Sequence, residues 1–384
     1  MAASGLSKEQ NWLGSLGATD SNSAEKERYA LIPVRLGKRR PSGPAPPVFR
    51  PPRCPNRECP QHHSPDPDFC TRNGFYRARC RPHPIPRFRC RSCLLGFSRQ
   101  TFRMDYRDHR PHLNTAVFTS IASGVGLRQT SRNLGLSLRC TELKFRKIAR
   151  HLIHLNLNLR GALGEGSILQ FDELETYEGR RNTRPLTVPV LIERRSRFVI
   201  WAESAPIRPS GRMTDARRRA IAADEKRFGE RPNRSNSAVE RAFRRGAELV
   251  RGLAEVVLQT DEKSTYPGLA ELVFGRGRLR HERTNSKLAR GTWNPLFPIN
   301  HSEAMARDLM GRLRRDSWLS SKKGRFLDLA LHVFMAYRNY VRRRFNRDRE
   351  SPAQLLGFVR RRLRPTELLS WRQDWGAASP RIVG

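Results

Sequence analysis

Two aspartates that follow short apolar runs are the strongest candidates for chemistry in this sequence. Asp172 directly follows SILQF and Asp261 directly follows EVVLQT, and both runs have the composition of buried strands. Adjacent parallel strands can bring such carboxylates within reach of one another. Carboxylate oxygens are ligands that Mg²⁺ prefers, and two such ions about 4 Å apart stabilise the attacking and leaving oxygens of phosphoryl transfer. The pair therefore predicts a metal-dependent site for phosphate chemistry, although each aspartate alone would be a turn residue or a helix cap.

A cluster of cysteines is the second candidate site. Six of the seven cysteines lie between Cys54 and Cys93, a pattern that excludes a disulfide-stapled secreted fold and favours metal binding. Two close pairs would supply four thiolates, which suit the tetrahedral preference of a structural zinc ion. The predicted Zn²⁺ ligands are Cys54, Cys59, Cys90 and Cys93. The competing ligands are His62, His63, Cys70 and Cys80, and the alternative without metal is a cluster of reduced thiols.

The charge of the chain indicates a polyanionic partner. Lysine and arginine number 74 against 36 aspartates and glutamates, a formal net charge of +38, and nucleic acid is the partner that best neutralises such an excess. The sequence has no apolar run of about 18 residues and no apolar segment behind a basic start, so we expect neither a membrane span nor a secretory signal. An RNA-binding or ribosome-associated protein would also explain the charge, but not the two strand-end aspartates.

Three predicted helices have the arrangement of a helix-turn-helix. Apolar residues recur at helical spacing over 113–122 and 127–136, the glycine-containing segment SGVG separates these ranges, and a third helix is expected over 138–155. In that arrangement the second helix enters the major groove of DNA. Its predicted DNA-contacting residues are Arg128, Gln129, Ser131 and Arg132. A three-helix core without DNA contact is the alternative.

After Gly161 the pattern changes to strands mixed with helices. The predicted strands are 167–171, 187–193, 197–203 and 255–260, and the predicted helices are 238–254, 266–274, 302–315 and 325–341. Strands come first and then alternate with helices, which predicts a mixed sheet with helices packed on it in one α/β domain. Residues 204–236, which are dense in arginine and proline, are interpreted as an insertion.

Several other residues near these motifs are weaker candidates. Glu173, Glu175 and Glu282 are interpreted as solvated charges. His301 is interpreted as a structural histidine, with contact to a phosphate as the alternative. Trp293 is interpreted as an anchor that packs its loop, with stacking on an unpaired base as the alternative.

The order and spacing of these motifs resemble a known family. The motifs that carry the resemblance are Asp172-Glu173 with Thr176-Tyr177-Glu178-Gly179, Asp261 with Ser264-Thr265-Tyr266, Asn300-His301-Ser302-Glu303, Arg307-Asp308, Arg312-Leu313-x-Arg315-x-Ser317 and Ser321-Lys322. Over roughly residues 54–345 the chain is similar to bacterial insertion-sequence transposases. Those proteins have an N-terminal zinc ribbon, a helix-turn-helix and a DDE-type catalytic domain of the RNase H fold.

The resemblance implies a metal-dependent DNA transposase, in which water or a 3′-hydroxyl attacks a phosphodiester and the element's ends are joined to target DNA. Mg²⁺ or Mn²⁺ would be held by Asp172 and Asp261, which match the first two acids of the family. The third position departs from an acidic triad, because Asn300 stands there and Glu303 lies one helical turn further on. The predicted third ligand is Asn300, which offers an oxygen but no charge, with Glu303 as the alternate or auxiliary ligand. A catalytically decayed homologue that acts as a DNA-binding regulator is therefore the alternative.

The expected fold is multidomain, with a zinc ribbon, a helical helix-turn-helix and an α/β RNase H-like domain whose mixed sheet has flanking helices. The expected boundaries are a basic, proline-rich tail at 1–52, the ribbon at 53–102, the helix-turn-helix at 103–160, the catalytic domain at 161–345 and a basic tail at 346–384. The expected partner is double-stranded DNA, both element ends and target. The active complex is expected to be a homo-oligomer, in the cytoplasm and associated with the nucleoid.

Overall fold

The structure is a computed structural model that describes residues 49–77, 84–285, 287–289, 291–314, 319 and 321–371. Most of the expected N-terminal tail, the end of the expected C-terminal tail and Cys80 lie outside the described residues. The architecture is mixed α/β, as predicted, with a mixed sheet and helices beside it.

The cysteine-rich segment forms a small antiparallel sheet with strand order β1-β2-β3. Its elements are α2 (Pro60–His63), β1 (Cys70–Tyr76), β2 (Ile85–Cys90), β3 (Gly96–Ser98) and the short 3-10 helix η1 (Arg99–Phe102). Few apolar side chains are buried here besides the cysteines, namely Phe69, Ile85, Phe88 and Phe97. The turn from β2 to β3 begins at Cys90 and includes Leu94 at a φ of 61°, so it bends sharply where two of the cysteines lie.

Helices occupy all three ranges in which a helix-turn-helix was predicted. They are α3 (Asn114–Ala122), preceded by the 3-10 turn η2 (Pro111–Leu113), α4 (Leu127–Asn133) and α5 (Leu138–Asn158). The helix α4 ends earlier than predicted, because Gly135 adopts a φ of 58°, outside the helical region. The Ser137 side chain caps α5 by accepting a hydrogen bond from the Cys140 N–H.

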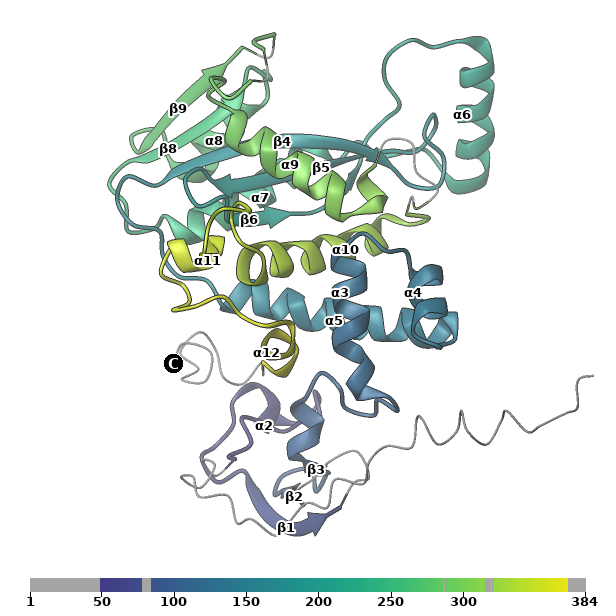
Figure 1. The fold of residues 1–384 in the computed structure, drawn as a ribbon, viewed down its shortest axis with the longest axis vertical. Helices are drawn as coiled ribbons and strands as arrows, with labels where there is room; N and C mark the ends of the chain where they lie inside the picture. Colours follow the sequence, from purple (N-terminus) through teal and green to yellow (C-terminus); the bar gives the residue numbers. More distant parts are fainter. Residues whose placement is uncertain are drawn as a thin grey trace, which may run out of the picture. The chain divides into compact units, whose positions relative to one another are not determined.

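The larger sheet contains both antiparallel and parallel strands. Its elements are β4 (Ile168–Tyr177), β5 (Pro185–Glu193), β6 (Val199–Ala202), β7 (Ala205–Pro206), β8 (Val256–Asp261) and β9 (Leu279–Thr284). The strand order is β6-β5-β4-β8-β9, with β7 paired to β5 (Figure 1). The strands β4, β5 and β6 form an antiparallel meander, whereas β8 and β9 run parallel to β4. Two parallel strands therefore lie side by side at the centre, β4 and β8.

Helices cover both faces of this sheet. The helices after β7 are α6 (Asp215–Phe228), α7 (Ser235–Leu249), α8 (Tyr266–Phe274), α9 (Phe297–Leu309) with the 3-10 turn η3 (Gly311–Leu313), α10 (Gly324–Ala336) with the π-helical turn η4 (Tyr337–Val341), α11 (Pro352–Leu355) and α12 (Pro365–Ser370). Of these, α7, α8, α9 and α10 pack against strands of the sheet. The Phe171 ring of β4 packs edge-on against Phe243 of α7 and Tyr266 of α8. Its neighbour Gln170 faces α9 instead, and Figure 1 shows α9 lying across that face. Alternate residues of β4 therefore face different helices.

The stretch 204–236, interpreted as an insertion, contains β7 and α6. The helix α10 packs against both α5 and β6, so the helical segment and the sheet share one apolar core. None of the helices in the described part of the chain is both long enough and apolar enough to cross a membrane.

Two buried histidines are neutral within this core. His151 of α5 is 4% exposed, and its Nε2 donates to the Leu368 carbonyl at 2.8 Å, which holds α12 against α5. His332 of α10 is 6% exposed and lies edge-on to the Trp201 ring. Burial lowers the pKa of each to about 4. Both rings therefore stay uncharged in the folded protein at pH values where they would take up a proton in the unfolded chain.

This difference predicts that stability falls as the pH falls. Between the unfolded-state pKa of about 6.5 and the folded-state pKa of about 4, only the unfolded chain binds these protons, so acid favours unfolding. Each histidine should contribute a loss of up to about 1.4 kcal/mol per pH unit in that window. We expect His151→Gln, which keeps a donor for Leu368, to reduce the slope of the unfolding free energy against pH in urea titrations from pH 7.5 to pH 5.

His112→Gln serves as the matched control, because His112 is exposed. An unchanged slope in His151→Gln would show that this ring is not the source of the acid sensitivity.

Candidate functional site

The two predicted aspartates lie at the same cavity. Its volume is about 600 Å³, and its wall includes Asp172 and Asp261 together with Glu303 of α9. Arginines line the same cavity, namely Arg181, Arg217 and Arg307. Carboxylates and guanidinium groups therefore share one concave surface, as binding a phosphate ester beside a cation would require.

The register between β4 and β8 explains why the aspartates meet. Gln170 pairs with Gln259 in the parallel ladder, and each aspartate lies two residues further along its strand. Residues two apart on a strand point to the same face, so Asp172 and Asp261 occupy equivalent positions on neighbouring strands. One expectation was wrong, since β4 does not end before Asp172. The strand continues to Tyr177 because β5 pairs with it over that whole length.

Buried glutamine side chains hold this register. Gln170 Nε2 donates to Gln259 Oε1 at 2.6 Å and to the Pro295 carbonyl at 2.8 Å, and its Oε1 accepts from the Ile299 N–H at 3.0 Å. Gln259 Nε2 donates in turn to Glu282 Oε2 of β9 at 2.7 Å. Gln170 has no exposed surface, and its side-chain oxygen and nitrogen both have partners, as burial of an amide requires. The network fixes β4, β8, β9 and the start of α9 relative to one another.

The start of α9 decides which residue reaches the cavity at the third position. Because α9 begins at Phe297, Asn300 lies in its first turn and Glu303 in the next. Glu303 is 5% exposed and lines the cavity, whereas Asn300 is half-buried and is not part of its wall. The placement thus brings Glu303, rather than Asn300, to the two aspartates.

The three carboxylates do not form a compact ligand cluster. Within the described ranges, the cysteine quartet is the one group of three or more histidine, cysteine or acidic side chains whose ligand atoms lie close enough to share an ion. Asp172, Asp261 and Glu303 line a single cavity but are spread further apart than such a group.

Glu173 is buried, which corrects its interpretation as a solvated charge. Its side chain is 9% exposed, forms an ion pair with Lys263 and accepts from the Tyr266 hydroxyl at 2.8 Å. Ser235 and Thr187 donate to its other oxygen, each at 2.8 Å. Burial raises the pKa of Glu173, but the bonds from Lys263 and the hydroxyl groups outweigh burial and hold the pKa below its usual value.

This network reaches the neighbouring aspartate. The Lys263 N–H donates to Asp261 Oδ1 at 3.2 Å, while the Lys263 ammonium pairs with Glu173. Glu173 therefore helps to position the loop after β8. The sequence could have indicated this role in part. If the strand continues past Asp172, the next residue, Glu173, points to the opposite face of the sheet, toward α7 and α8.

The other weaker candidates differ in how exposed their side chains are and in what they contact. Glu175 is exposed, as expected, and the Glu282 side chain is 43% exposed while it accepts from Gln259. Trp293 is 97% exposed, so its interpretation as a packing anchor is wrong. The His301 ring packs against Phe297 and Phe345, and its buried Nδ1 has no hydrogen-bond partner.

Three of the four predicted DNA-contacting side chains are exposed on α4, namely Arg128, Gln129 and Arg132. Ser131 is 7% exposed, and its hydroxyl donates to the Arg128 carbonyl at 2.8 Å. It faces the interior of the helical segment, because it follows the buried Thr130 on the inner side of α4. This placement removes Ser131 from the surface that DNA would contact.

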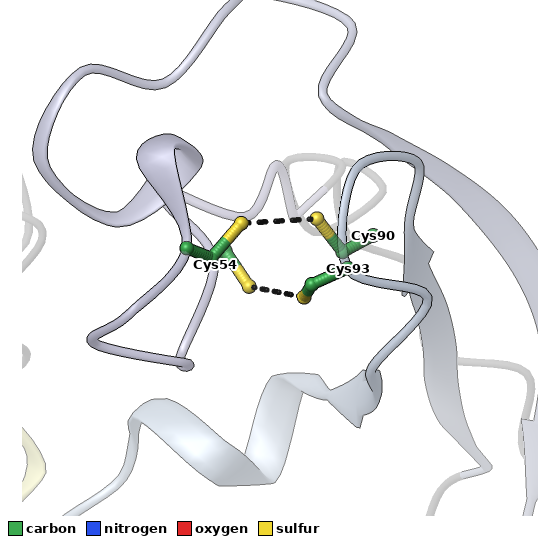
Figure 2. A group of neighbouring side chains, drawn as sticks. Cys54, Cys90 and Cys93 are labelled. Carbon is green, nitrogen blue, oxygen red and sulfur yellow. Dashed lines mark hydrogen bonds between the residues drawn. The ribbon is translucent and has the colours of Figure 1, made fainter.

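The four predicted zinc ligands come together at the ends of two loops. The Sγ atoms of Cys54, Cys59, Cys90 and Cys93 all lie within 4.8 Å of one another. Cys54 and Cys93 are 3.5 Å apart, and Cys59 and Cys90 are 3.9 Å apart. Figure 2 shows the side chains of Cys54, Cys90 and Cys93 turned toward one another. Four thiols in such a cluster fit a structural metal ion such as zinc.

The competing ligands lie outside this quartet. His62 Nδ1 hydrogen-bonds the Cys54 carbonyl at 2.7 Å, and His63 Nε2 hydrogen-bonds the Arg57 carbonyl at 3.1 Å. Cys70 lies on β1 and is not a member of the group. Burial raises the pKa of Cys54, whereas a hydrogen bond from the Leu95 N–H lowers the pKa of Cys93 to about 7. The Cys93 thiol is thus easier to ionise than an ordinary cysteine.

No protein-family model matches the chain, and no curated protein matches it.

The cysteine geometry predicts one zinc ion per chain. Cys90→Ser should abolish stoichiometric zinc after purification without chelators, because a hydroxyl is a poor substitute for a thiolate. The loss of metal should also lower the midpoint of thermal unfolding of the cysteine-rich segment. Elemental mass spectrometry measures the zinc content per chain. Scanning calorimetry of the full chain measures the midpoint of thermal unfolding.

Cys140→Ser is the matched control, because Cys140 lies on α5 outside the quartet. Cys70→Ser tests the competing ligand. A chain that loses zinc with Cys70→Ser and keeps it with Cys90→Ser would contradict this ligand set.

Proposed function

We propose that the protein is a DNA transposase of a bacterial insertion sequence, which cleaves phosphodiesters at the ends of its element and transfers the strands to target DNA. The observation that carries the proposal is the placement of Asp172 and Asp261 at equivalent positions of neighbouring parallel strands, with Glu303 lining the same cavity. A net charge of +38 supports DNA as the substrate.

The domain assignment belongs to the same proposal. We assign residues 53–102 as a zinc ribbon, 103–160 as a helix-turn-helix and 161–345 as an RNase H-like catalytic domain. The cysteine quartet, the three helices α3 to α5 and the mixed sheet support these three assignments in turn. DNA contact through α4 rests on the exposed Arg128, Gln129 and Arg132.

In this proposal Asp172 and Asp261 hold Mg²⁺ or Mn²⁺, and Glu303 or Asn300 completes the site. The metal, when bound, would polarise the phosphodiester and activate the attacking water or 3′-hydroxyl. Arg307 lies in the cavity wall, and its buried Nε has no hydrogen-bond partner. The Arg307 guanidinium therefore adds positive charge beside the bound phosphate in this proposal. Glu173 keeps Lys263 and the loop after Asp261 in position.

A second function also has an observation in its favour. The three carboxylates are spread around the cavity, and an uncharged Asn300 stands where the family has its last acid. Both features suit a decayed homologue that binds DNA as a regulator. In either case double-stranded DNA is the partner and the nucleoid is the place of action, and synapsis of two element ends calls for a homo-oligomer in an active transposase.

Replacement of either aspartate distinguishes the two functions. Asp172→Asn and Asp261→Asn should each lower cleavage and strand transfer by roughly 100-fold or more, because each removes a charged metal ligand. Both variants should still bind the ends. The assay uses DNA carrying the sequences that flank the gene, with Mg²⁺ or Mn²⁺, and follows product on gels. Asp215→Asn is the control, since Asp215 is exposed on α6.

Specific binding without product from the unaltered protein would instead support the regulator. Equal activity of the unaltered protein and both variants would remove the two aspartates from the mechanism.

The third ligand is a separate prediction. Because Glu303 lines the cavity and Asn300 does not, Glu303→Gln should lower the rate more than Asn300→Ala and should raise the Mn²⁺ concentration needed for half-maximal cleavage. Titration of Mn²⁺ against the initial cleavage rate measures both effects. The reverse order of effects would assign Asn300 as the ligand.

A further inference from the structure

A surface rich in arginine lies apart from the acidic cavity. Two chain segments form it, the turn 194–197 between β5 and β6 and the loop 342–349 after η4. We call it the arginine patch and define it by Arg194, Arg195, Arg342, Arg343, Arg347 and Arg349. Four of these side chains are exposed and two are half-buried. Among the described residues of these two segments, Arg344 with Asp348 is the one ion pair.

The two segments are joined by specific contacts. Arg344 Nη1 donates to the Arg195 carbonyl at 3.2 Å, which connects the loop to the turn. The loop closes on itself through a hydrogen bond from the Arg344 N–H to the Glu350 carbonyl at 2.9 Å. Its arginines are therefore held on an ordered loop beside the turn.

Two buried arginines lie directly beneath the patch. Arg197 is 8% exposed, and its guanidinium carbon lies 5.7 Å from the centre of the Phe297 ring and 5.6 Å from that of Phe345. Its buried Nη1 has no hydrogen-bond partner. Arg338 has no exposed surface, donates to the Arg343 and Arg344 carbonyls and leaves its Nε without a partner. Neither guanidinium pairs with a carboxylate of the described residues.

This arrangement costs free energy in the protein alone. A buried charge without a counter-ion is unfavourable, and Arg197 also adopts a left-handed φ of 64°, which is strained for a side chain of its size. Glu193, at the end of β5, accepts instead from the Arg195 and Ser196 N–H groups. Burial, followed by repulsion from neighbouring arginines, lowers the pKa of Arg197 and of Arg338 to about 10.

We infer that the arginine patch binds backbone phosphates of nucleic acid, at a surface separate from α4 and from the acidic cavity. Phosphate oxygens accept several guanidinium hydrogen bonds at once. A bound polyanion would also offset the uncompensated charge of Arg197 and Arg338. The inference rests on the proposed function for its choice of DNA, since free inorganic phosphate has the same chemistry.

The surface adjoins the helix that completes the proposed active site. Phe297 and His301 of α9 pack around Arg197 and Phe345, so the patch is built in part on the start of α9. DNA held there would run past the end of the sheet at which α9 begins.

The test compares two triple variants of the full chain that lose the same charge. The patch variant carries Arg195→Ala, Arg343→Ala and Arg347→Ala, and the control carries Arg251→Ala, Arg276→Ala and Arg280→Ala, all exposed in the folded protein. Fluorescence anisotropy with a labelled duplex of arbitrary sequence gives the binding constant over a range of salt. The slope of its logarithm against log salt should become less steep by about 2 to 3 in the patch variant, since each phosphate contact contributes about 0.9.

The control variant should keep the slope of the unaltered protein. Equal losses in both variants would overturn the inference, because the effect would then belong to net charge. Circular dichroism and thermal unfolding of both variants should match the unaltered protein, and Arg197→Lys, which keeps the buried charge, should bind DNA with an unchanged slope.

A second arm separates the two sources of phosphate. The thermal midpoint is measured with inorganic phosphate and with chloride at equal ionic strength. Stabilisation by phosphate that the patch variant loses, together with an unchanged DNA slope, would make free phosphate the ligand and overturn the assignment to nucleic acid. The slope does not depend on cleavage. If the unaltered protein does not cleave DNA while the patch variant still shows the less steep slope, the result contradicts the proposed function and supports binding of nucleic acid by the arginine patch.

Discussion

Two buried glutamine side chains fix the register on which the candidate site depends. Gln170 and Gln259 hydrogen-bond each other across β4 and β8, and Gln170 also holds the chain at Pro295 and Ile299. A slip of one residue between the strands would turn one aspartate to the opposite face of the sheet. It would also leave buried amides without partners, at a cost of about 1–3 kcal/mol for each group. A wrong register is thus penalised at two core glutamines, each two residues before one of the aspartates on the same strand.

Two neighbouring acids of β4, Asp172 and Glu173, differ in the contacts that their side chains make. Asp172 and Glu173 both line the cavity, but the Glu173 carboxylate also pairs with Lys263 and accepts from the Tyr266 hydroxyl. At this cavity the Glu173 carboxylate is thus held by donor groups of Lys263, Tyr266, Ser235 and Thr187. Neighbouring carboxylates can serve different purposes because their surroundings, and not their identities, determine their hydrogen-bond partners.

The sequence predicted the elements that have strong apolar patterns, and it failed where contacts between distant segments decide. The helix α8 occupies its predicted range of 266–274, and β8 differs by one residue at each end. The strand β9 was missed, because LRHERT has no apolar alternation and is held in the sheet by pairing with β8. The position of Glu303 at the cavity could not be predicted, since it depends on where α9 begins. That start is set by a hydrogen bond to Gln170, far away in sequence.

The thin core of the cysteine-rich segment would make its folding depend on a metal ion held by the four clustered cysteines. Apart from the cysteines, the buried apolar side chains among the segment's described residues are Phe69, Ile85, Phe88 and Phe97. An ion that binds only the folded form stabilises that form by mass action. With Cys54, Cys59, Cys90 and Cys93 as ligands, the fraction of folded segments follows the free zinc concentration. In a cell short of zinc, the larger sheet and its helices would then stay folded while the cysteine-rich segment is unfolded.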